Sequence, residues 1–96
     1  MDTDDLSEEA YEAVIAESDR FHEDLTLQFG LLAEDCMDEK EYLEECRKLI
    51  FEIRQLKQDE LEDIFFEDIP PLPQLRAVLD KLLRNIDRVI NNSIKK

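Results

Sequence analysis

The single histidine of the chain, His22, follows Asp19 by three residues, and this spacing could support metal binding or proton transfer. Metal sites in helical bundles combine Glu from two helices with a Glu-x-x-His motif from each of two others. Only one comparable pair occurs here, with Asp in place of Glu. We therefore interpret His22 as a histidine at the edge of the core, with a metal ligand or a catalytic base as the alternatives.

Other catalytic signatures are missing from the sequence. One glycine in 96 residues excludes glycine-rich phosphate loops and Ser-centred elbows with glycines on both sides, and no loop has calcium-hand spacing. Carboxylate pairs carry little information among 26 acidic residues. We expect no catalytic residue, metal or cofactor, and predict that the protein is not an enzyme. A metal-dependent or hydrolytic helical enzyme is the alternative.

The two cysteines, Cys36 and Cys46, could form a disulfide bond in principle. If Cys36 lies at the top of a second helix, Cys46 lies about one to two turns down it, a rise of about 10 Å that is beyond the reach of a disulfide. We expect both to be reduced, buried, apolar side chains.

All three prolines lie in one stretch, Pro70, Pro71 and Pro73. Proline lacks the amide hydrogen that a helix needs and clashes with the preceding turn, although it suits the first turn of a new helix. The stretch therefore predicts a break between two helices. A proline-rich peptide ligand is the alternative.

Apolar residues recur at helical spacing in three segments. The first runs from about residue 6 to 35, and its predicted N-cap is Asp5, with Glu8 three residues later. The second runs from about residue 39 to 67, and its predicted N-cap is Asp38. The third runs from about 73 to 92.

These segments predict an all-α fold, an antiparallel up-down-up three-helix bundle with two long helices and a shorter third. Short connections place consecutive helices side by side in opposite directions. We expect residues 1–96 to form a single helical domain, with 1–5 and 93–96 frayed.

The net charge of −14 should repel phosphate backbones and anionic membrane surfaces. We therefore expect no direct nucleic-acid binding and no membrane association, and no small-molecule substrate is evident. No apolar run approaches a membrane span, and the acidic start lacks the pattern of a signal peptide. These features predict a cytoplasmic protein.

Charge is unevenly distributed along the chain. Residues 73–96 contain six basic and two acidic side chains, a net +4, which leaves −18 on the remainder. We expect the third helix to offset the negative charge of the other two. Its basic ridge, a site for an acidic partner or simply an ion-pairing face, consists of Lys81, Arg84 and Arg88.

Several large apolar residues lie off the predicted core faces. At about 100° per residue, two of them fall almost opposite the core face of the first helix and two fall well off that of the second. They form a possible partner or dimer surface, or are scattered surface residues: Leu27, Leu31, Phe51 and Phe66.

The favoured interpretation is a small noncatalytic acidic helical protein-interaction module, an adaptor or regulator that could also self-associate. The alternative is an acidic decoy that imitates nucleic acid and binds a basic protein.

Overall fold

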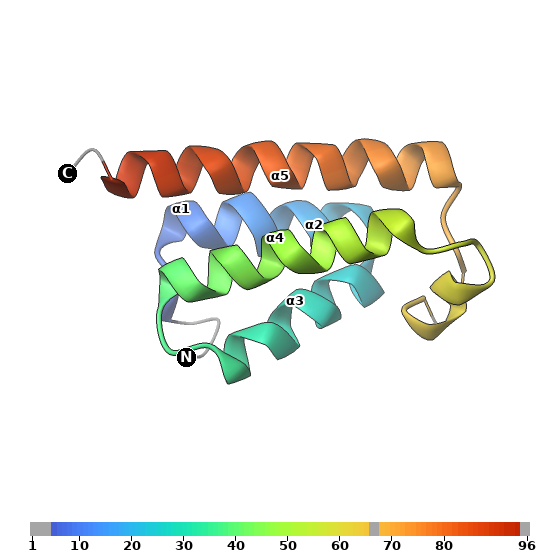
Figure 1. The fold of residues 1–96 in the computed structure, drawn as a ribbon, viewed down its shortest axis with the longest axis horizontal. Helices are drawn as coiled ribbons and strands as arrows, with labels where there is room; N and C mark the ends of the chain where they lie inside the picture. The colour runs from blue at the N-terminus through green and yellow to red at the C-terminus, as the bar shows by residue number, and fades with distance from the viewer. Residues whose placement is uncertain (1–4, 66–67, 95–96) are drawn as a thin grey trace.

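A computed structural model describes residues 5–65 and 68–94, and all regular elements in these ranges are helical. These helices form four rods within the described residues, arranged as in Figure 1. The first rod joins α1 (Glu8–Tyr11), the π-helical turn η2 (Glu12–Ala16) and α2 (Glu17–Phe21). It is followed by α3 (Glu23–Asp35), α4 (Glu39–Gln55), a short 3-10 helix η3 (Glu60–Asp63) and α5 (Leu72–Ile94).

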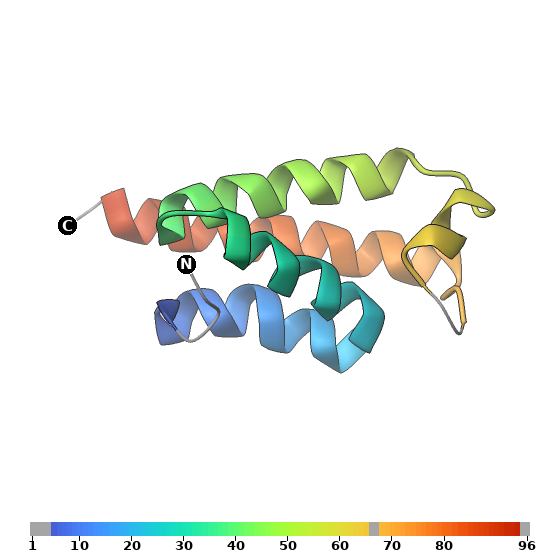
Figure 2. The same ribbon diagram turned by 90° about the horizontal axis from the view of Figure 1, so that it is seen from below.

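The predicted three-helix arrangement is not what the structure has, because the helix predicted over 6–35 is two helices. His22 is extended, with φ −160° and ψ 129°. Its backbone N–H donates to the Ser18 carbonyl at 2.8 Å and closes α2. Its Nδ1 accepts the Asp24 backbone N–H at 3.1 Å and caps α3. One residue therefore separates two helices, and the chain reverses there (Figure 2).

The apolar pattern continues through this reversal, which explains why periodicity alone predicted one helix. Val14 and Ser18 before the turn are fully buried, as are Leu25 and Phe29 after it. Both rods turn these residues towards the same core. The Ser18 and Thr26 hydroxyls meet across the turn at 2.9 Å.

The predicted end of the second helix near residue 67 is also wrong, because α4 ends at Gln55 and Leu56 is extended. After α4, Leu61 and Phe65 are buried. The Phe65 ring meets the His22 ring edge to face, with centroids 4.8 Å apart. These contacts place the segment after α4 against the α2–α3 turn. Phe66 and Glu67 lie outside the described residues.

The other boundaries are closer to the prediction. α4 begins at Glu39, and the Asp38 carboxylate accepts the Glu41 N–H at 2.8 Å. α1 begins at Glu8 after an N-cap at Ser7, two residues beyond the predicted cap. α5 spans Leu72–Ile94 where 73–92 was predicted; Pro70 and Pro71 lie before it, and Pro73 lies in its first turn.

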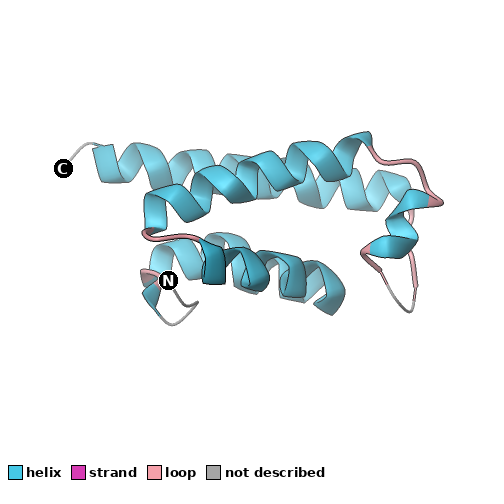
Figure 3. Ribbon diagram, turned by 60° about the horizontal axis from the view of Figure 1, so that its bottom comes forward, coloured by secondary structure: helices cyan, strands magenta, loops and turns pink. Residues whose placement is uncertain are grey.

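The rods enclose one core (Figure 3). The first rod and α4 each pack against both α3 and α5, so α3 and α5 lie at opposite corners of the bundle. Every rod contributes fully buried side chains to the core, among them Val14, Phe29, Ile50, Leu79 and Ile86. The outer face of α3 therefore points away from α5.

The cap at His22 should be a measurable source of stability. His22→Ala removes the Nδ1 acceptor and the Nε2 contact to the Asp68 carbonyl, which lies at 3.1 Å. We expect a loss of about 1–2 kcal/mol in the free energy of unfolding, measured by urea denaturation. His22→Asn keeps a short acceptor at the cap and should lose less. An alanine variant as stable as the wild type would contradict this role.

Candidate interaction surface

The outer face of α3 carries two large apolar side chains. Leu27 and Leu31 are 50% and 49% exposed, whereas Leu25 and Phe29 on the same helix are fully buried. At about 100° per residue, the exposed pair points almost opposite the buried pair. The structure therefore brings Leu27 and Leu31 together on one exposed face of α3, one turn apart. Figure 1 shows α3 on the side of the bundle away from α5.

Carboxylates bound this apolar pair at both ends. Glu23 lies one turn before Leu27, and Glu34 and Asp35 lie one turn after Leu31; all three acidic residues are exposed. α3 contains no Lys or Arg. The resulting surface is an apolar centre between two negative ends. We call it the α3 face: Glu23, Leu27, Leu31, Glu34 and Asp35.

Phe51 belongs to a different face. It is 47% exposed and borders an open groove of about 360 Å³ on α4, lined by Glu44, Arg47, Lys48 and Phe51. Arg47 and Arg54, one turn before and one turn after Phe51, pair with Asp87 at 3.5 Å and Asp80 at 3.0 Å on α5. Phe51 thus lies on the α5 side of α4, apart from Leu27 and Leu31.

The predicted surface is therefore only partly assembled. Leu27 and Leu31 lie together, Phe51 lies elsewhere, and Phe66 falls outside the described residues.

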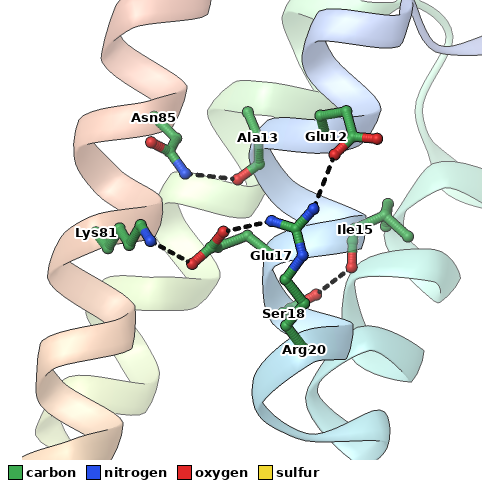
Figure 4. Close-up of polar contacts among 8 residues, drawn as sticks. All are labelled: Glu12, Ala13, Ile15, Glu17, Ser18, Arg20, Lys81 and Asn85. Atoms are coloured by element: carbon green, nitrogen blue, oxygen red, sulfur yellow. Dashed lines mark hydrogen bonds and ion pairs between the residues drawn. The ribbon is translucent and has the colours of Figure 1, made fainter.

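The basic ridge divides into a paired and an exposed part. Lys81 donates to Glu17 at 2.8 Å, and Glu17 also accepts from Arg20 at 3.1 Å (Figure 4). Arg84 and Arg88 are exposed, and neither forms an ion pair with any residue that the structure describes. Lys81 is thus part of the packing between α5 and the first rod.

The same interface contains a hydrogen bond from the Asn85 side chain to the Ala13 carbonyl, at 3.1 Å. Ala13 lies in the π-helical turn, where the regular backbone hydrogen-bond pattern is interrupted. Asn85 therefore ties α5 to this irregular turn (Figure 4).

The third helix was expected to supply positive charge to its neighbours, but most of its described ion pairs have the opposite polarity. Three ion pairs join α5 to other helices within the described residues, and two of them place the carboxylate on α5: Arg47 with Asp87 and Arg54 with Asp80. Among these three pairs, Lys81 alone supplies positive charge from α5 to an acidic neighbour. The exposed Arg84 and Arg88 form no direct ion pair with the described part of residues 1–72.

His22 is held by the fold through both ring nitrogens. Because Nδ1 accepts the Asp24 N–H, Nε2 carries the proton and donates to the Asp68 carbonyl at 3.1 Å. Within residues 5–65 and 68–94, no group of three or more His, Cys, Asp or Glu side chains is placed to hold a metal ion. His22 acts here as a helix cap.

Cys36 and Cys46 are buried in the core near Tyr42. Burial raises the pKa of Cys46 to about 12, and burial with the nearby Glu41 and Glu45 raises the pKa of Cys36. Burial also raises the pKa of Tyr42, followed by a smaller effect of Cys46. The Tyr42 hydroxyl has no hydrogen-bond partner of ordinary geometry. These groups are protonated and inaccessible at neutral pH.

Comparison with protein-family models, curated proteins and solved structures finds no match to this chain. Within the described residues, no helix combines the length and apolar character needed to cross a membrane.

Two features of the surface had not been recognised from the sequence, the Glu17–Lys81 pair and the position of Gly30. The signal for Gly30 was present, because it is the only glycine and lies inside an apolar helical pattern.

The buried hydroxyl of Tyr42 should be dispensable. Tyr42→Phe keeps the ring and removes a fully buried hydroxyl whose interaction with the Cys46 thiol lacks ordinary hydrogen-bond geometry, so we expect a gain of about 1 kcal/mol in the free energy of unfolding, measured by urea denaturation. Tyr11→Phe is the control, since Tyr11 is 41% exposed and its change should be near zero. A clear loss of stability in Tyr42→Phe would show that the hydroxyl has a partner.

Glu17 should make stability depend on pH. The hydrogen bond from Lys81 lowers the pKa of Glu17 below its usual 4.5. The contribution of charged Glu17 to the free energy of unfolding is therefore complete above pH 4.5. It is lost as pH falls through the lower pKa of Glu17 in the folded state. Glu17→Gln should cost about 0.5–1 kcal/mol at neutral pH, and the difference from wild type should shrink below about pH 4.

The control for this pair is Glu12→Gln, because the Glu12 side chain is 55% exposed and contacts Arg20 alone among the ion pairs described. At neutral pH, Glu12→Gln should lower the free energy of unfolding by less than Glu17→Gln. A Glu17→Gln cost that is the same at every pH would contradict a charge-dependent contribution.

Proposed function

We propose that this protein is a noncatalytic acidic helical interaction module, an adaptor or regulator that binds another protein through the α3 face. The observation that carries the proposal is the half-exposure of Leu27 and Leu31 side by side on an outward helix face. In a chain this short, apolar residues are needed for the core, and two adjacent leucines facing solvent are a natural contact for a partner.

The state of the reactive side chains supports a binding role. His22 uses both nitrogens to hold the α2–α3 turn. Cys46 is fully buried, and its pKa is raised away from neutrality. The side chains that would most readily act as base or nucleophile therefore serve the fold. The burial of both cysteines as apolar core side chains also favours a reducing compartment, so we propose a cytoplasmic location.

A decoy that imitates nucleic acid is the second candidate, favoured by the −18 carried by residues 1–72. Such a decoy would bind a basic nucleic-acid-binding protein mainly through charge. Its affinity would fall steeply with salt and would depend little on Leu27 and Leu31. Binding that survives high salt but needs the two leucines would favour the adaptor.

The test is a comparison of captured proteins. Wild-type protein and a Leu27→Gln/Leu31→Gln variant are immobilised and exposed to extract of the source cells, with Phe51→Gln as the matched control of similar exposure. We expect a protein that wild type and Phe51→Gln retain and the α3 variant loses, followed by titration with that purified protein. Identical sets of retained proteins from wild type and the α3 variant would overturn the proposal.

A further inference from the structure

Gly30 lies in the middle of α3, where glycine is among the poorest helix formers. It is the only glycine in the chain. A Cβ added at Gly30 would meet nothing within 4 Å. Alanine would therefore fit and would strengthen the helix, so the described packing gives no reason for glycine at this position.

Gly30 lies among the residues of the α3 face. Leu27, Gly30, Leu31 and Glu34 are spaced i, i+3, i+4 and i+7, the four positions that surround a hole on a helix surface in knobs-into-holes packing. Because Gly30 has no side chain, only three side chains surround this hole. It is therefore wider than a hole lined by four side chains, and a partner side chain can come closer to the α3 backbone. A large apolar side chain from another helix could enter between the two leucines.

The surroundings of the hole favour a positively charged partner. Glu23 lies two turns before Leu31, and Glu34 and Asp35 follow it, so both ends of the α3 face are negative. With no Lys or Arg on α3, the helix offers no local positive charge of its own. The chain as a whole adds a net charge of −14. Local and overall fields therefore attract cationic segments.

We propose that the α3 face receives a basic amphipathic helix of a partner protein, whose apolar side chain fills the hole beside Gly30 and whose Lys or Arg side chains contact the negative ends. This inference rests on the proposed function and names the chemistry of the partner.

A second copy of this chain fits the face less well. Two α3 faces brought together would oppose three exposed carboxylates on each face, six in all, without a basic residue on either helix. Phe51 of a second copy has basic neighbours, but Arg47 and Arg54 are already paired with Asp87 and Asp80. Each approaching copy would also bring a further net charge of −14.

The probe is a helical peptide with free ends blocked, built on alanine and glutamine, with two leucines four residues apart and lysines one turn beyond each. Binding is followed by amide chemical shifts of the isotopically labelled full chain. We expect shifts centred on α3 and an affinity that falls about tenfold or more between about 0.05 and 0.3 M salt. A charge-reversed peptide with glutamates for lysines is the control.

Gly30→Ala separates a binding role from a structural one. It should raise the thermal midpoint by about 4 °C or more, because alanine is the better helix former. It should nevertheless weaken peptide binding about tenfold, as should Leu27→Gln with Leu31→Gln. Phe51→Gln should leave peptide binding unchanged. A purely structural Gly30 would not combine higher stability with weaker binding.

Four results would overturn the inference: no shifts at millimolar peptide, equal binding of the charge-reversed peptide, shifts centred away from α3, or undiminished binding to Gly30→Ala. Sedimentation of the wild type provides a further check. Self-association that Leu27→Gln/Leu31→Gln abolishes would assign the face to a second copy instead. The capture comparison could still succeed with a partner of other chemistry, so failure here is distinguishable from failure of the proposed function.

Discussion

The hydrogen bonds at His22 hold one extended residue between two helices that would otherwise run on as one. The Ser18 carbonyl accepts the backbone N–H of His22. The His22 ring accepts the Asp24 N–H at Nδ1 and donates from Nε2 to the Asp68 carbonyl. Because the ring also packs against Phe65, the reversal and the segment after α4 stabilise each other. Without this turn, α3 would extend away from the first rod and the four-rod core could not close.

The reversal also decides which residues face solvent. Once α3 folds back, its buried face packs against the first rod and α4, and its opposite face is left at a corner of the bundle. Leu27 and Leu31 are exposed for this reason, between carboxylates that no basic residue of α3 offsets. The proposed interaction therefore follows from the fold and the local charge together, since either feature alone is common on protein surfaces.

The sequence predicted the helical class, the start of α4 at Glu39, the proline break and the outward position of Leu27 and Leu31. It did not predict the turn at His22, because apolar spacing is unchanged when consecutive helices face one core. The end of α4 was missed because the contacts of Leu61 and Phe65 are tertiary. In the Arg47–Asp87 and Arg54–Asp80 pairs, the carboxylate lies on α5 and the guanidinium on α4. This choice depends on helix register, which composition does not specify.

The reversal at His22 is tested most directly by a nuclear Overhauser measurement on the unmodified protein. The Ser18 and Thr26 hydroxyl oxygens lie 2.9 Å apart across the turn. In an uninterrupted helix these residues would be separated by about 12 Å along the axis. We predict cross-peaks between the Ser18 β-protons and the Thr26 side chain. Their absence, together with unbroken helical contacts through residues 18–26, would contradict the account.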